Sequence, residues 1–225
     1  MTRPTSDALV IECIQTSMYT HPFLPQPGDE VLRRFVIENP FCQMITASVQ
    51  GGLHCSALVL IPDETADELT LLGHLAKRNP HADALVHADS ALALFSGPHG
   101  YVSPSRYEDK PDVPTWNYVA VQARGELEVI DDVGAIEVLL RDTVDYMERA
   151  QATPWTLDQV TAERVSALLN GVLGFRIVVK KLEGTFKLSQ NKSDADKKRV
   201  ADHFLSSNCL ADVEIGRLML KEIAS

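Results

Sequence analysis

Alternating apolar and polar side chains between residues 118 and 130 limit the fold more than any other segment of this chain. Five apolar residues recur there with a period of two, so they share one face of a β-strand. They are Val119, Val121, Ala123, Leu127 and Val129. Further strand-like runs lie at residues 41–49, 53–61, 69–75, 91–95 and 173–182. Since few helical segments separate these runs, the sequence predicts an antiparallel β-structure rather than a doubly wound sheet.

The connections between the predicted strands support this fold class. Gly51 and Gly52 indicate a hairpin turn at residues 50–53, because glycine tolerates positive φ. Helical patterns flank the strands at residues 29–39, 131–149, 154–169, 193–205 and 210–223. Ser193 is a good N-cap, and Asp196 three residues later completes the pattern of a capping box. The fold class is therefore mainly β with flanking helices (α+β).

Composition and charge exclude several classes of function. No apolar run in the 225 residues approaches the roughly 20 residues that a membrane helix needs. The first four residues do not begin a basic leader followed by an apolar stretch, so we expect a cytoplasmic protein. The formal net charge of −10 disfavours DNA binding, because an acidic protein repels phosphates unless it carries a local basic patch. The last two predicted helices faintly resemble a helix-turn-helix, but their acidic and basic residues balance.

The cysteines and the common catalytic motifs are uninformative in this chain. The four cysteines form no Cys-x-x-Cys pair, which argues against a zinc ribbon or a thioredoxin-type site. Cys42 lies in an apolar run and is expected to be a small buried hydrophobe. No His-Glu-x-x-His, Gly-x-Ser-x-Gly, dinucleotide fingerprint or Walker motif occurs, and no compact metal-ligand cluster is visible.

A basic pair at the end of a predicted strand is the first candidate site. Lys77 and Arg78 follow the strand at 69–75, and Asn79 and Pro80 are typical of a helix N-terminus. Two cations beside a helix N-terminus suit a phosphate group, because backbone donors and the helix dipole add to the charge. The alternative is a solvated loop, which composition alone favours.

Three further segments carry candidate chemistry. Residues 97–115 are rich in Pro, Gly, Ser and Tyr, so we expect a stretch that is mostly loop, with a short strand at 101–102. His99 in this stretch is either an acid–base group or a structural histidine. Trp116 and Asn117 could border a planar heterocycle, although core packing of Trp116 at the start of a strand is the more common role. Residues 186–192 gather polar side chains after a strand, with a capping turn as the alternative.

Taken together and in this order, these segments resemble one family. The matching motifs are GHLAKRNP at 73–80, GPHGYVSPSRY at 97–107, VPTWNYVAV at 113–121, GF at 174–175 and KLSQN at 187–191. The chain is similar in these motifs to the PaiB-like FMN-binding negative transcriptional regulators, over about residues 18–204. The resemblance implies an antiparallel FMN-binding split β-barrel, related to pyridoxamine-phosphate oxidase-like flavoproteins, with a C-terminal helical hairpin.

The resemblance also implies a set of cofactor-binding residues and an FMN site at a homodimer interface. A basic pair in the matching place of such barrels holds the FMN phosphate, which gives this role to Lys77 and Arg78. The whole expected set is Ser56, His74, Lys77, Arg78, Asn79, His99, Trp116, Asn117, Lys187, Gln190 and Asn191. No metal site is expected.

This chain departs from the family pattern at two places. The family's Thr-His-x-Pro motif is replaced by Ser56-Ala57-Leu58-Val59, so any flavin contact by that histidine is lost. The family's first motif is only loosely matched at residues 18–23, which makes residues 1–17 an extension. We therefore expect an extension at 1–17, a barrel at 18–190 and a helical hairpin at 191–225.

The sequence leaves three functions open. The first is an FMN-binding homodimer whose regulatory role is implied only by the family's name. The second is an FMN-dependent oxidoreductase that acts on a small molecule near His99. The third is a barrel that has lost flavin and works as a binding module.

Overall fold

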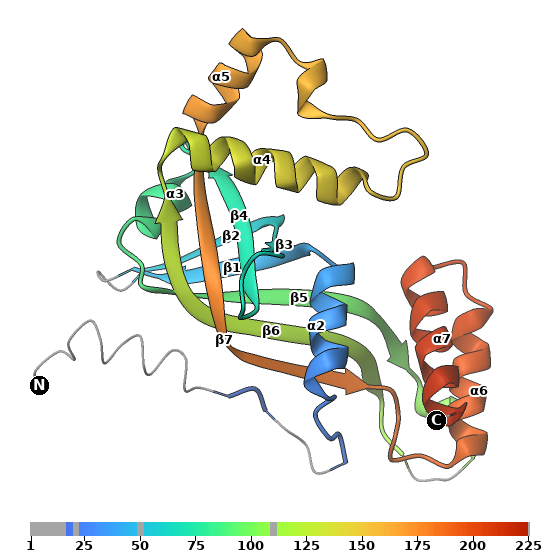
Figure 1. The fold of residues 1–225 in the computed structure, drawn as a ribbon. Coiled ribbons are helices and arrows are strands. Elements are labelled where there is room, and N and C mark those ends of the chain that lie inside the picture. The colour runs from blue at the N-terminus through green and yellow to red at the C-terminus, as the bar shows by residue number, and fades with distance from the viewer. Residues whose placement is uncertain (1–16, 20–22, 49–51, 109–111, 225) are drawn as a thin grey trace, which may run out of the picture. The chain divides into compact units, whose positions relative to one another are not determined.

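The computed structural model describes residues 17–19, 23–48, 52–108 and 112–224 (Figure 1). Contacts divide the chain into two compact units, which are described separately. The first unit holds Val36–Phe95 and Gln122–Leu182, and the second holds Ser17–Phe35, Ser96–Val121 and Glu183–Ser225. The predicted extension at 1–17 and the turn at 50–53 lie largely outside the described residues. The expected boundary at residue 190 stays a prediction.

The elements follow one another as the sequence predicts, with helices on either side of a run of strands. The strands are β1 (Phe41–Ala47), β2 (Leu53–Val59), β3 (Ile61–Pro62), β4 (Thr70–Ala76), β5 (Ser90–Val102), β6 (Thr115–Ile130) and β7 (Val172–Lys187). The helices are α2 (Asp29–Glu38), α3 (Pro80–Leu85), α4 (Val133–Glu148), α5 (Ala162–Gly171), α6 (Asp194–Leu205) and α7 (Leu210–Ala224). Two short 3₁₀ turns lie at Pro104–Arg106 and Leu157–Gln159.

All seven strands contribute to the sheet of the first unit, in the order β2-β1-β5-β6-β7-β4-β3. The pairs β1–β2, β1–β5, β3–β4 and β4–β7 are antiparallel, as expected. Side chains buried in this unit include Cys42, Met44, Leu71, Phe95, Phe175 and Ile177. Burial raises the pKa of the Cys42 thiol to about 12, with Cys55 adding to the shift, so Cys42 is the inert hydrophobe that the sequence predicts.

The second unit contains the far ends of β5, β6 and β7 together with α6 and α7. Its apolar core consists of Val102, Tyr107, Val119, Leu188, Val200, Ala201, Phe204, Ile215 and Met219. The α6–α7 pair forms the predicted helical hairpin, and the two helices pack closely on each other (Figure 1). Within this unit a Cβ at Gly100 would lie 2.5 Å from the Phe204 ring, so Gly100 lets α6 approach β5.

The prediction of a loop from residue 97 onward is wrong for its first part. Strand β5 continues without a break to Val102, so the GPHGYV stretch is strand, and irregular chain begins only at Ser103. The reason is that Gly97 and Gly100 make room for neighbouring rings rather than for a turn: a Cβ at Gly97 would lie 2.9 Å from Phe35. Strands β6 and β7 are also longer than expected, by three and five residues respectively at the ends in this unit.

Candidate functional site

The expected cofactor-binding residues fall into two groups, one in each unit. Ser56, His74, Lys77, Arg78 and Asn79 belong to the first unit. The other six, His99, Trp116, Asn117, Lys187, Gln190 and Asn191, belong to the second. Each group is described on its own.

The basic pair lies in the tight turn between β4 and α3. Strand β4 ends at Ala76, and Asn79 is the N-cap of α3, with its side-chain oxygen accepting from the His81 N–H at 3.0 Å. Lys77 and Arg78 are exposed, and neither makes an ion pair with any residue that the structure describes. Because α3 has only six residues and Asn79 already caps it, any anion here depends on the two side-chain charges.

A buried hydrogen-bond network supports this turn from the sheet. Ser56 Oγ accepts from Asn79 Nδ2 at 3.1 Å and lies 2.9 Å from His81 Nδ1. The other ring nitrogen of His81, Nε2, lies 2.9 Å from Thr46 Oγ1, and the ring stacks on His54 with centroids 5.6 Å apart. Ser56 therefore positions Asn79 and the turn rather than standing free in a site.

His81 is the residue of this network that sequence reasoning missed. It is 2% exposed, and burial lowers its pKa from the ordinary 6.5, with the nearby His54 adding to the shift. The neutral ring can donate one hydrogen bond and accept one, which suits two hydroxyl neighbours. The sequence gives one indication of this role, because His81 lies two residues after Asn79, the predicted N-cap.

His81 does not replace the histidine that the family pattern places in β2. That histidine would stand at Ala57, which is exposed, whereas Ser56 beside it is buried against His81. Successive side chains of a strand point to opposite faces, so the two positions face different surroundings. The lost histidine therefore has no substitute in this network.

His74 lies on β4 and is half-buried. Its Nδ1 is buried without a hydrogen-bond partner among the described residues. Burial also lowers the pKa of His74, which favours a neutral ring. His74 therefore carries no charge that would attract a phosphate at neutral pH.

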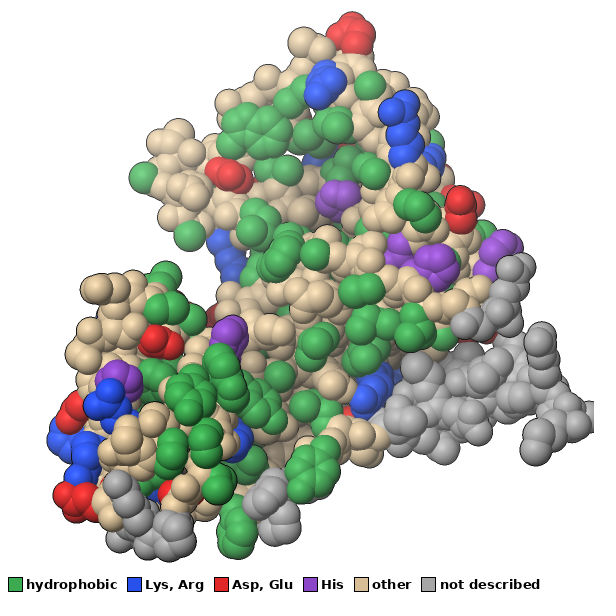
Figure 2. All heavy atoms as spheres, turned by 180° about the vertical axis from the view of Figure 1, so that it is seen from behind, with side chains coloured by type: hydrophobic (Ala, Val, Ile, Leu, Met, Phe, Trp, Pro, Cys, Tyr) green, Lys and Arg blue, Asp and Glu red, His purple; other side chains and the backbone are tan. Residues whose placement is uncertain are grey.

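An exposed aromatic cluster occupies one face of β5 and β6 in the second unit. Trp116 is 51% exposed, so the alternative of core packing is wrong. Its ring lies 5.7 Å from that of His99 and 6.1 Å from that of Tyr101, measured between centroids. Hydrophobic side chains gather at the surface of the unit that carries α6 and α7 in Figure 2. The cluster offers a flat apolar surface with a histidine at its edge.

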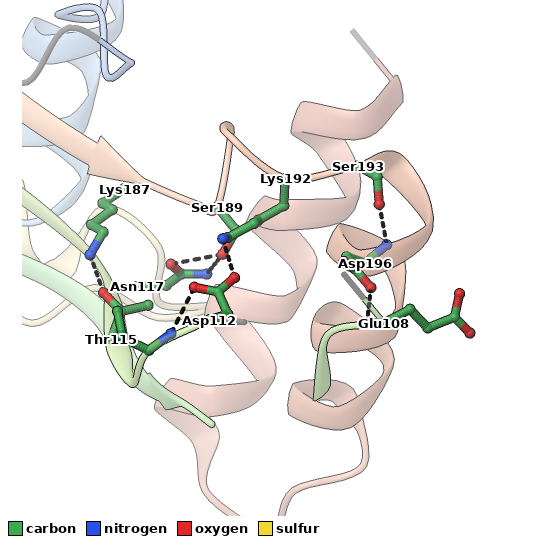
Figure 3. A network of polar contacts seen from close by, with 10 residues as sticks. Glu108, Asp112, Thr115, Asn117, Lys187, Ser189, Lys192, Ser193 and Asp196 are labelled. Carbon is green, nitrogen blue, oxygen red and sulfur yellow. Dashed lines mark hydrogen bonds and ion pairs between the residues drawn. The ribbon is translucent and has the colours of Figure 1, made fainter. Parts of the chain in front are cut away.

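Asn117, next to Trp116, points the other way into protein (Figure 3). It is 0% exposed, and its Nδ2 donates to Ser189 Oγ at 2.9 Å and contacts the sulfur of Met219 at 3.2 Å. Ser189 has a φ of 64°, the only described non-glycine residue with positive φ. Asn117 therefore holds the strained turn at Ser189 and presents no free group to a ligand.

The polar segment after β7 is built around this turn. Lys187 Nζ donates to Thr115 Oγ1, and burial lowers the pKa of Lys187. The Gln190 side chain is used by the backbone, accepting from Leu188 N at 2.7 Å and donating to Phe186 O. Asn191 is exposed. Of the expected residues in the KLSQN motif, Lys187 and Asn191 are thus the two whose side chains can still bind a ligand.

Lys187 and Asn191 line a pocket of about 210 Å³ in the second unit. Its other walls are Phe23, Leu24, Tyr107, Asp112, Val113, Thr115, Ser189 and Lys192. Lys192 Nζ pairs with Asp112 and lies 4.7 Å from the centre of the Tyr107 ring. The Lys192 contact, followed by the backbone N–H of Val113, lowers the pKa of Asp112. Sequence reasoning missed Asp112 and Lys192, because 80 residues separate them.

No group of three or more His, Cys, Asp or Glu side chains within the described residues is placed to hold a metal ion. No helix within the same residues has the length and apolar character to cross a membrane.

Comparison with known proteins places this geometry in context. Residues 18–181 match the family model described as "Putative FMN-binding domain". The chain is 31% identical over 179 residues to the Protease synthase and sporulation protein PAI 2 of Bacillus subtilis, which covers 80% of this chain and 85% of that protein.

Two solved structures share the fold at low sequence identity. The FAD and heme binding protein from Mycobacterium smegmatis gives a TM-score of 0.52 at 16% identity, covering 76% of this chain and 78% of the other. The flavocytochrome Anf3 from Azotobacter vinelandii gives 0.53 at 14% identity, covering 76% and 73%. These likenesses confirm the predicted split-barrel fold.

Proposed function

Because the chain belongs to the PaiB-like family of FMN-binding split-barrel proteins, we propose that it is an FMN-binding homodimer that holds the cofactor phosphate through Lys77 and Arg78. The single observation that carries the proposal is the state of these two cations. Both are exposed in one tight turn, and neither has an ion-pair partner among the described residues.

The basic turn fits a phosphate group chemically. A phosphate dianion needs charge-assisted donors, and the planar guanidinium of Arg78 can supply two parallel hydrogen bonds where Lys77 supplies a point charge. The network of Ser56, Asn79 and His81 fixes the turn from behind, so the two side chains start from a rigid base. In a chain of net charge −10, this pair gives an anion a local positive charge.

The aromatic cluster of the second unit, taken by itself, suits a planar aromatic ring. FMN, when bound, supplies an isoalloxazine ring that exchanges electrons and protons. Trp116 and Tyr101 present flat apolar faces to a planar heterocycle, and His99 at the edge can donate or accept a hydrogen bond.

The homodimer and the regulatory role rest on the family. A flavin on an exposed surface leaves one face open to water, and a second copy of the chain would cover it. The family name implies negative regulation of transcription, while the balanced charges of α6 and α7 favour a packing role for that hairpin over DNA recognition. We place the protein in the cytoplasm on the same basis.

The test is a titration of Lys77→Ala and Arg78→Ala with FMN and with riboflavin, which lacks the phosphate. Charged hydrogen bonds contribute roughly 1.5–3 kcal/mol each, so each variant should bind FMN about tenfold to a hundredfold more weakly. Riboflavin affinity should change little. Flavin fluorescence quenching measures both affinities on the same samples.

Arg106→Ala is the matched control, since it removes an exposed cation from a different loop. Equal losses for FMN and riboflavin would place the phosphate elsewhere. A wild-type protein that binds neither flavin would leave the third function, a flavin-free binding module.

A further inference from the structure

The pocket beside the Ser189 turn has an unbalanced charge. Lys192 is neutralised by Asp112. Lys187 has no carboxylate partner among the described residues and donates only to the Thr115 hydroxyl. An ammonium group has three N–H donors, so two remain for a ligand (Figure 3). Among the described residues, the pocket wall thus carries one positive charge that no carboxylate pairs with.

Tyr107 is a second polar residue of the same wall. Tyr107 is 3% exposed, and its hydroxyl is buried without a hydrogen-bond partner among the described residues. Burial raises the pKa of Tyr107, so the hydroxyl keeps its proton and remains a donor. Ser189 lies near enough to act on this pKa but not in hydrogen-bonding geometry. Buried donors without partners are rare in native proteins.

The strained backbone at Ser189 belongs to the same pocket wall. A serine in the left-handed region is uncommon, and such conformations concentrate at functional sites. Asn117 holds Ser189 in place from the buried side. The wall is therefore preorganised and does not need a ligand in order to form.

The size and the remaining walls narrow the class of ligand. Phe23, Leu24 and Val113 give the pocket an apolar part. A volume of about 210 Å³ exceeds the roughly 150 Å³ cavity that admits benzene. It lies below the roughly 300 Å³ at which pockets for drug-sized ligands begin. One net positive charge suits a monoanion better than a phosphate dianion.

We propose that this pocket binds a small monocarboxylate with an apolar body, whose carboxylate lies against Lys187 and whose body lies against Phe23, Leu24 and Val113. The site goes beyond the proposed flavin function, since it needs neither FMN nor the basic turn of the first unit.

The experiment is calorimetric titration of the flavin-free wild-type protein with benzoate, with benzamide as the neutral isostere and with inorganic phosphate. Benzoate should bind at least tenfold more tightly than the other two, because only benzoate combines one negative charge with an apolar ring. Tight binding of benzamide would overturn the role of Lys187. Tight binding of phosphate in place of benzoate would overturn the monocarboxylate.

Variants locate the binding in this pocket. Lys187→Met should weaken benzoate about tenfold to a hundredfold, and Lys187→Arg should restore part of the loss. Tyr107→Phe removes only the hydroxyl oxygen and should weaken benzoate severalfold, which tests the site even if Lys187→Met folds poorly. Lys77→Ala, in the other unit, should bind benzoate like the wild type.

The two proposals fail separately. Benzoate binding by a wild-type protein that takes up no FMN leaves the carboxylate site standing and removes the flavin function. FMN binding without benzoate binding does the reverse. Unchanged benzoate affinity in both Lys187→Met and Tyr107→Phe would overturn the site.

Discussion

Gly125 lies in β6 where the backbone of β7 comes closest. A Cβ there would lie 2.1 Å from the carbonyl oxygen of Val178, a backbone atom that cannot move without disturbing the sheet. We therefore expect Gly125→Ala to lower the free energy of unfolding by about 2–3 kcal/mol. Gly171→Ala is the control, because no atom lies within 4 Å of its Cβ position. Urea unfolding should show at most a small change for Gly171→Ala; equal losses in the two variants would contradict this account.

The buried His81 makes stability depend on pH. Its pKa is lowered in the folded protein, so the unfolded chain binds the proton more readily. The contribution of His81 to the free energy of unfolding is therefore fully present above the ordinary pKa of 6.5. It is lost as the pH falls from 6.5 toward the lowered pKa of the folded protein. His74 acts in the same direction. We expect His81→Gln to lose part of this acid sensitivity when the free energy of unfolding is measured from pH 7.5 down to pH 5. An unchanged pH dependence in that variant would contradict it.

At the level of elements, α4 depends on its N-cap. Asp132 accepts from Ala135 N at 2.8 Å and so satisfies a free donor in the first turn. Asp132→Ala should cost about 1 kcal/mol, while Asp132→Asn should keep most of the stability. The control is Asp131→Ala, which removes a neighbouring exposed carboxylate outside the cap. Thermal unfolding of the three variants checks the order; similar losses for Asp131→Ala and Asp132→Ala would refute the cap.

Local patterns predicted most elements, because they depend on neighbours in the chain. The period of two gave β6, and Asn79 and Ser193 marked the N-caps that the structure has. The capping box at α6 is only half formed. Ser193 Oγ accepts from Asp196 N, but the Asp196 carboxylate accepts from Glu108 N at 2.8 Å, far along the chain.

What the sequence could not predict depends on distant partners. The glycines of β5 were interpreted as a turn, because nothing local says that Gly100 is there for the Phe204 ring. Likewise, the motif around Asn117 indicated a ligand edge, whereas its amide is used by Ser189, 72 residues away. The pairing of Lys192 with Asp112 could not be predicted for the same reason, because the two residues are far apart in the sequence.

At the scale of the whole molecule, the exposed aromatic cluster predicts that two copies of the chain associate. Tyr101 and Trp116 of this cluster are 48% and 51% exposed, so the cluster offers apolar surface that a second copy of the chain can cover. We expect the wild type to be a dimer in light scattering at micromolar concentration. Trp116→Glu should shift it toward monomer, because a charge would be buried at the contact. Lys198→Glu, on the exposed side of α6, is the control. A monomeric wild type with flavin bound would contradict the dimer.

Strands β5, β6 and β7 each begin in one unit and end in the other. The chain passes repeatedly between the units, so no continuous fragment contains either of them whole. Because neither unit is one continuous stretch of chain, a gene fusion at a chain end could not have added one unit to the other. For the same reason, a single recombination crossover could not exchange a whole unit between two related proteins. The turn of Lys77 and Arg78, proposed to bind phosphate, and the pocket proposed to bind a carboxylate lie in different units of this kind. They can therefore diverge by point substitution but are inherited together.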